Sequence, residues 1–142
     1  MEQYRIIKFL KVDGYERFAK IQILGKQDKN YKVHFSENDE YLEDGQVSQK
    51  KKPGDIISGN IFIDLAFCTK KSDSDIMFIQ NIPNSVRVDA IVEVSRIEDE
   101  YTIYAKTTII DDEILVEFER EVELEIGDKI LLDGSLELEI EE

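Results

Sequence analysis

The chain has 142 residues, of which 42% are hydrophobic and 35% charged, and its formal net charge at pH 7 is −14. The apolar fraction is that of a folded protein, whereas the negative charge argues against broad affinity for nucleic acid or anionic lipid, both of which need clustered Lys and Arg. One cysteine excludes an internal disulfide, one histidine excludes a multi-histidine metal site, and no apolar run approaches the ~20 residues of a membrane-spanning helix. We therefore expect a cytoplasmic protein.

Alternation of apolar and polar residues, which is typical of strands with one buried face, runs along most of the chain. It is clear in residues 31–36 and in the β-branched and aromatic segment 61–67. Residues 86–94 and 101–110 are expected to pair as a hairpin around the polar segment 98–100. The sequence therefore predicts mostly strands, with a helical turn or two expected only in residues 74–80.

Glycine dipeptides predict where the last strands turn. Gly127-Asp128 and Asp133-Gly134 both combine glycine with a residue that favours turns, and the second is a preferred dipeptide of two-residue hairpins. Short strands separated by such turns predict an all-β, antiparallel fold.

An internal repeat is the main sign of domain organisation. Three matches occur in the same order in the two halves: 18–24 with 104–110, 33–35 with 116–118, and 53–63 with 126–138. Each half has a three-strand meander, a Gly-Asp turn and a closing hairpin, a plan that resembles small five-stranded barrels of the OB or SH3-like kind. We expect two such repeats, residues 1–72 with a long exposed loop at 36–52 and residues 73–142; one larger barrel or sandwich is the alternative.

The charge is divided unequally between these halves. Residues 1–72 hold 13 Lys and Arg against 11 Asp and Glu, a net charge of +2. Residues 73–142 hold 5 against 21, a net charge of −16. The acidity of the chain therefore belongs to its second half.

Carboxylates recur at every second residue in two segments of the acidic half. Because successive strand side chains point to opposite faces, each segment would form a carboxylate row opposite an apolar row. The rows serve either to dock a basic partner or to keep an exposed strand from pairing with a neighbour. The candidate partner-binding residues are Glu117, Glu119, Glu121, Glu123, Glu125, Glu137 and Glu139.

The sequence contains no set of residues that forms a catalytic or metal-binding constellation. His34 is expected on an exposed face with Lys32 and Ser36, and Cys68 is expected to be a buried small apolar residue. The acidic triplets 73–75 and 111–113 lack the spacing of a calcium loop. We therefore expect no enzyme activity, no metal and no cofactor.

The leading functional hypothesis is a non-enzymatic protein whose acidic face binds a basic protein partner. This profile is similar to small acidic inhibitors, such as immunity proteins or mimics of nucleic acid. One alternative is an OB-like oligonucleotide-binding module in the first half, based on the lysines 50–52 and on aromatic residues that are mostly expected in the core. These aromatic residues are Tyr4, Tyr15, Phe18, Tyr31 and Phe35. Another alternative is a structural subunit of a larger assembly.

Overall fold

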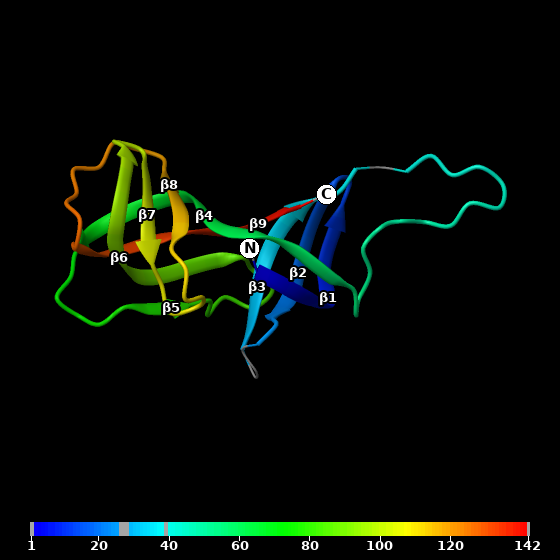
Figure 1. The fold of residues 1–142 in the computed structure, drawn as a ribbon, viewed down its shortest axis with the longest axis horizontal. Helices are drawn as coiled ribbons and strands as arrows, with labels where there is room; N and C mark the ends of the chain where they lie inside the picture. Colours follow the sequence, from blue (N-terminus) through cyan, green and yellow to red (C-terminus); the bar gives the residue numbers. More distant parts are fainter. Residues whose placement is uncertain (1, 26–28, 39, 142) are drawn as a thin grey trace. The chain divides into compact units, whose positions relative to one another are not determined.

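The computed structural model describes residues 2–25, 29–38 and 40–141, and over these residues it contains strands and no helix (Figure 1). The prediction of an all-β fold is confirmed. The strands are β1 (Glu2–Asp13), β2 (Glu16–Ile23), β3 (Asn30–Ser36), β4 (Ile56–Lys71), β5 (Met77–Ile79), β6 (Arg87–Asp99), β7 (Thr102–Lys106), β8 (Ile114–Phe118) and β9 (Lys129–Ile140).

The strands are hydrogen-bonded in the order β1-β2-β3-β9-β4-β8-β7-β6-β5, with the additional pairings β1–β4 and β9–β6 that give ring-like closure. The pairing of β4 with β8 is parallel, so the sheet is mixed. The expectation of a purely antiparallel sheet is therefore wrong. Alternation reports which face of a strand is buried but does not report the direction of its neighbour.

Contacts within the chain divide it into two compact units. Unit 1 comprises residues 1–60 and 138–142, and unit 2 comprises residues 61–137. Strands β4 and β9 each contribute one end to unit 1 and the other end to unit 2. The internal duplication of residues 1–72 and 73–142 stays a prediction.

Unit 1 is built on the meander of β1, β2 and β3, to which the first residues of β4 and the last residues of β9 are added. Every second residue of β2 is buried, as its alternation predicts. Gly59 is required because a Cβ there would lie 2.3 Å from the backbone oxygen of Glu139. The core side chains of unit 1 are Tyr4, Ile6, Ala19, Ile21, Ile23, Val33, Phe35, Ile57 and Leu138.

Unit 2 contains the pairings of β4 with β8, β8 with β7, β7 with β6 and β6 with β9, and the short strand β5 is added to β6. The predicted hairpin of residues 86–94 and 101–110 is confirmed as β6 and β7. The largest fully buried side chains of unit 2 are Ile63, Ile103, Ile109, Ile130, Leu132 and Leu136.

Two local predictions in unit 2 are wrong. Gly134 is not in a turn but inside β9, where a Cβ would lie 2.6 Å from Cγ2 of Ile63 and 3.0 Å from the backbone oxygen of Asp64. Glycine is used there for close approach of two strands, which a sequence cannot distinguish from a turn. The expected helical turn at 74–80 is instead occupied by β5, because Phe78 pairs with Ala90 of β6.

Candidate binding sites

The acidic segment after β8 keeps its alternation but is not a strand. β8 ends at Phe118, so of the five carboxylates from Glu117 to Glu125 only Glu117 lies in a strand. The backbone N–H of Glu119 donates to the oxygen of Ala66 (3.1 Å), and that of Val122 donates to the oxygen of Glu100 (2.8 Å). The segment is therefore a loop held to different neighbours, and the expected carboxylate row on one strand is not formed.

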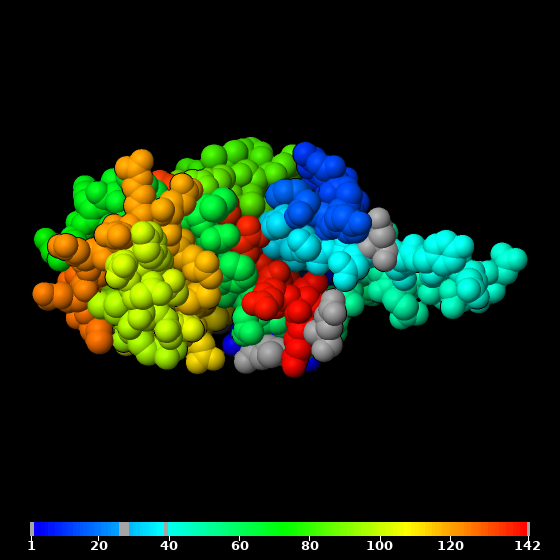
Figure 2. Space-filling model, turned by 90° about the horizontal axis from the view of Figure 1, so that it is seen from above, coloured from blue at the N-terminus to red at the C-terminus, as the bar shows by residue number. Residues whose placement is uncertain are grey.

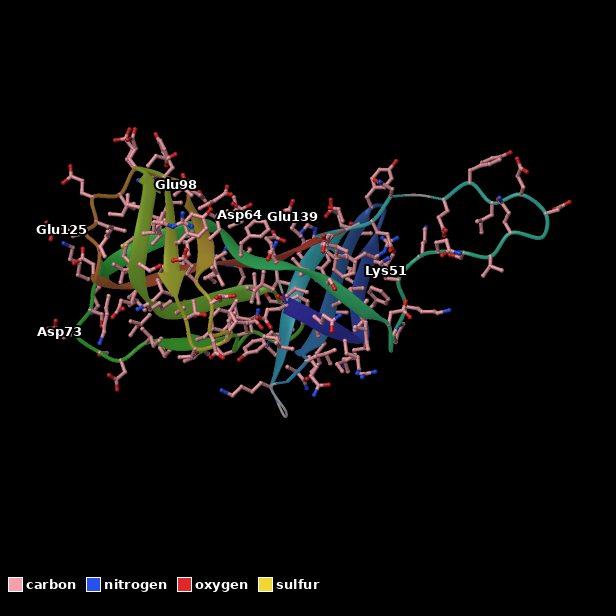
Figure 3. The ribbon with its side chains drawn as sticks, in the orientation of Figure 1. Lys51, Asp64, Asp73, Glu98, Glu125 and Glu139 are labelled. Carbon is pink, nitrogen blue, oxygen red and sulfur yellow. The ribbon has the colours of Figure 1, made fainter. Side chains whose placement is uncertain are left out.

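This loop lines an open hollow in unit 2 of about 400 Å³, which we call the acidic hollow. Its apolar lining combines buried Ile103 with Val122 and Leu124, which are both half-buried. Its charged lining is Asp99, Glu100, Glu123, Glu125 and one cation, Lys71. Figure 3 labels Glu125 on the loop after β8 and Glu98 on β6, which is not part of the lining. Apolar walls with a carboxylate rim suit a Lys or Arg side chain, whose stem is apolar and whose head is charged.

Hydrogen bonds fix the loop at both of its ends. The hydroxyl of Tyr101 donates to Oε1 of Glu121 (3.3 Å), and the charge of Glu121 is the main cause of a raised pKa at Tyr101. Oδ2 of Asp128 accepts from the backbone N–H of Glu125 (2.9 Å) and lies 3.2 Å from Nζ of Lys71. The N–H of Glu125 is also the main cause of a lowered pKa at Asp128. These contacts hold the loop at Glu121 and at the backbone of Glu125.

The other two predicted carboxylates lie on β9 in different units. Glu137 is half-buried in unit 2, and Glu139 is exposed in unit 1. Of the seven predicted binding residues, only Glu123 and Glu125 line the acidic hollow. Asp99 and Glu100 were not among the candidates, because nothing in the sequence shows that the turn between β6 and β7 meets the loop after β8.

A basic surface that the sequence analysis missed lies on the outer face of β1, β2 and β3. The register places Lys20 directly opposite Lys8 on one side and Lys32 on the other. Like charges directly opposite on neighbouring strands destabilise a sheet by about 0.2–1 kcal/mol a pair. We call this surface the basic face; its cations are Arg5, Lys8, Lys11, Lys20 and Lys32.

Aromatic rings lie beside the lysines on the basic face. Phe18 is opposite Lys11 and His34, and its ring centroid is 4.9 Å from that of His34. Nε2 of His34 also pairs with Oε2 of Glu16. Of the five aromatic residues proposed for base stacking, Tyr4 and Phe35 are in the core, as expected, whereas Phe18 is on this outer face.

The described residues of the loop between β3 and β4 form an arm of unit 1, which projects from the surface in Figure 2. Oε2 of Glu37 accepts from the backbone N–H of Lys51 (2.8 Å), and Oε2 of Glu40 accepts from that of Gln49 (2.6 Å). The hydroxyl of Ser48 and this N–H together hold the pKa of Glu40 below its usual value. Hydrogen bonds from backbone N–H groups to carboxylates, rather than strand pairing, therefore join the two sides of the arm. The side chain of Tyr41 on this arm is 91% exposed.

The base of the arm is joined to β2 through a buried ion pair. Arg17 is 4% exposed, and its Nε lies 3.6 Å from Oε1 of Glu37. Its Nη1 donates to the backbone oxygen of Gly14 at 2.6 Å. The two charges therefore face each other inside unit 1, although within the described residues Oε1 of Glu37 accepts no hydrogen bond.

Cys68 is a free, half-buried thiol whose pKa is raised by burial. Within the ranges that the structure describes, no three His, Cys, Asp or Glu side chains are grouped as a metal would require. The described part of the chain also has no helix with the length and apolarity to cross a bilayer.

No protein-family model, no curated protein and no solved structure matches the chain. The acidic hollow, the basic face and the arm are therefore the features of the molecule that bear on function.

Proposed function

We propose that the chain is a non-enzymatic, cytoplasmic binding protein whose unit 2 captures a basic surface of another protein at the acidic hollow. The observation that carries the proposal is the combination of apolar walls with four carboxylates and a single cation in one hollow. A Lys or Arg side chain of the partner would bury its stem against Val122 and Leu124 and present its charge to Glu123 and Glu125.

The charge of unit 2 supports the same role. It holds 7 Lys and Arg against 19 Asp and Glu, a net charge of −12, whereas unit 1 holds 11 against 13. A field of this sign attracts a basic protein before contact and makes association fast and sensitive to salt. This behaviour suits a small inhibitor of a basic protein, such as an immunity protein or a mimic of nucleic acid.

We also propose that the units are two small five-stranded barrels of the OB or SH3-like kind. The support is the order of strand pairing. β4 pairs with β9, β1 and β8, and β9 pairs with β4, β3 and β6, so that both strands contribute to each unit. Barrels of this kind present binding surfaces on rigid strands. This architecture names no ligand by itself.

The proposal is tested by titrating the protein against a fluorescein-labelled oligolysine peptide at about 50 mM salt and following anisotropy. The triple variant E100Q/E123Q/E125Q removes three charges from the hollow. We expect it to weaken binding at least about tenfold, equivalent to ~1.4 kcal/mol. The control D75N/D89N/D112N removes three exposed charges of unit 2 outside the hollow and should stay within about twofold of wild type.

Equal weakening by the two triple variants would show that only net charge matters and would contradict the hollow as the binding site. Failure of the wild-type protein to bind oligolysine at this salt concentration would contradict the proposal as a whole. Circular dichroism of each variant confirms that its strands are intact.

A further inference from the structure

Lys71, the last residue of β4, is the one cation among the residues that line the acidic hollow. Its side chain is 63% exposed, and its Nζ lies 3.2 Å from Oδ2 of Asp128. An ammonium group on an apolar stem is also what a basic partner would bring to this hollow. The free protein therefore places a lysine of its own chain at the site where we expect a lysine of the partner.

The carboxylate that pairs with Lys71 is fixed by its own backbone contacts. The N–H of Gly127 donates to the backbone oxygen of Val94 (2.8 Å), and the N–H of Val94 donates to that of Asp128 (2.8 Å). Oδ2 of Asp128 also accepts from the backbone N–H of Glu125 (2.9 Å), and its side chain is only 20% exposed. None of these bonds involves Lys71, so Asp128 keeps its position when Lys71 moves away.

Lys71 also lines a second open hollow of unit 2, which has a volume of about 330 Å³. The exposed carboxylate of Asp73 belongs to the lining of this second hollow. An ion pair whose lysine is as exposed as Lys71 contributes little to stability, because water and salt compete with it. The ammonium group of Lys71 can therefore leave Asp128 for the side of Asp73 at small cost.

The charge of Lys71 opposes the binding of a second cation. An ammonium group that approaches Glu123 and Glu125 in the acidic hollow also approaches Lys71, which lines the same hollow. Like charges brought together across an interface lower its affinity. A partner's lysine is therefore bound more tightly when Lys71 is displaced or has lost its charge.

We propose that Lys71 is an internal competitor of the basic partner, which occupies the acidic hollow in the free protein and is displaced toward Asp73 when a lysine of the partner binds. This inference rests on the proposed function, to which it adds a residue that sets the affinity. All residues involved belong to unit 2. If Lys71 instead positioned the loop through Asp128, its removal would weaken binding, so the sign of the effect distinguishes the two roles.

The test is the titration of labelled oligolysine at about 50 mM salt, followed by fluorescence anisotropy, with variants of single lysines. K71M removes the charge but keeps an unbranched apolar stem, and it should tighten binding about threefold or more. K71R keeps the positive charge and should not tighten binding.

Lys106 gives a matched control in the same unit. Its side chain is 61% exposed and its Nζ lies 3.6 Å from Oε2 of Glu93, so it resembles Lys71 in exposure and in pairing with one carboxylate. Lys106 is not among the residues that line the acidic hollow. K106M should therefore leave the affinity for oligolysine within about twofold of wild type.

The proposal is overturned if K71M, with its strands intact by circular dichroism, binds oligolysine like wild type or more weakly, or if K106M tightens binding equally. Should E100Q/E123Q/E125Q still weaken binding, these results would leave the proposed function standing and remove only the role of Lys71. Failure of both wild type and K71M to bind oligolysine would overturn both proposals. Binding by K71M but not by wild type would support the competitor, since Lys71 would then block the hollow.

Discussion

The basic face of unit 1 and the acidic hollow of unit 2 collect charge in different ways. The three central lysines of the basic face come from three paired strands, and register alone makes them neighbours. The acidic hollow is lined by a hairpin turn and a loop, and its neighbours are set by backbone hydrogen bonds such as Val122 to Glu100. A dense run of charge in the sequence is therefore a poor guide to a charged site, because dispersed residues can form the better surface.

The largest expected effect is on unit 1 alone, through the buried pair of Arg17 and Glu37. Arg17→Leu leaves the Glu37 carboxylate buried without its cation and should lower the free energy of unfolding by about 3–5 kcal/mol in urea denaturation. The double variant R17L/E37L removes both charges and should lower the free energy of unfolding by less than Arg17→Leu alone. A single variant as stable as wild type would show that the pair does not hold the base of the arm.

The two glycines at which β4 and β9 approach each other give one matched change in each unit. A Cβ at Gly59 meets the backbone oxygen of Glu139 at 2.3 Å, and one at Gly134 meets Cγ2 of Ile63 at 2.6 Å. Gly59→Ala and Gly134→Ala should each cost about 1–3 kcal/mol in chemical denaturation, since strands or side chains must shift.

Gly59→Ala should lower the free energy of unfolding more than Gly134→Ala does. The added Cβ at residue 59 meets backbone atoms, whereas the atom nearest to the added Cβ at residue 134 is a side-chain methyl carbon. Ser58→Ala, next to Gly59 on the same strand, is the control and should change stability by less than either. Variants of both glycines within ~0.5 kcal/mol of wild type would contradict the close approach of β4 and β9.

These glycines and the lysine row also show how far the sequence could be interpreted. Alternation predicted the strands and most of the core, and it correctly placed Phe35 inside. It misassigned residues 119–125, because a loop held by backbone hydrogen bonds to its neighbours half-buries Val122 and Leu124 without strand pairing.

The lysine row depends on irregularities that no pattern reveals. The turn after Asp13 pairs Asp13 with Glu16, and an unbroken register from there would place Lys8 opposite Ile21. A bulge between Phe9 and Lys11 shifts the register by one residue and brings Lys8 opposite Lys20. The only available sequence signal was the polar, outward position of each lysine on its own strand.

Acidification should affect one carboxylate in each unit in the same direction. The hydroxyl of Ser48 lowers the pKa of Glu40 in the arm, and the hydroxyl of Ser95 lowers that of Glu113 beside β6. When folding lowers the pKa of a carboxyl group, its ionised form stabilises the folded protein at pH values above the pKa of the unfolded chain. This stabilisation is lost as the pH falls through the pKa of the folded form.

Between about pH 6 and pH 3, hydrogen exchange at the backbone N–H of Gln49 should therefore speed up relative to the pH dependence of an unstructured peptide. Glu40→Gln should remove most of this excess change. An excess change of the same size in Glu40→Gln would show that the arm is not held by this carboxylate.

The smallest effect concerns Tyr101 at the rim of the acidic hollow. Because the charge of Glu121 raises the pKa of Tyr101, Glu121→Gln should lower the pH at which this tyrosine ionises in an ultraviolet titration. Tyr104, also in unit 2, lies instead under the guanidinium of Arg96, with 3.9 Å between Cζ of Arg96 and the ring centroid. A Tyr101 titration unchanged by Glu121→Gln would contradict the placement of the loop over the hollow.

The central claim is that the acidic hollow of unit 2 binds basic side chains of a partner. It is tested most directly by titrating wild type, E100Q/E123Q/E125Q and D75N/D89N/D112N with labelled oligolysine in one buffer. We predict that the first triple variant loses affinity at least about tenfold and that the second stays within about twofold of wild type. Equal weakening by the two triple variants, or weakening by neither, would contradict the claim.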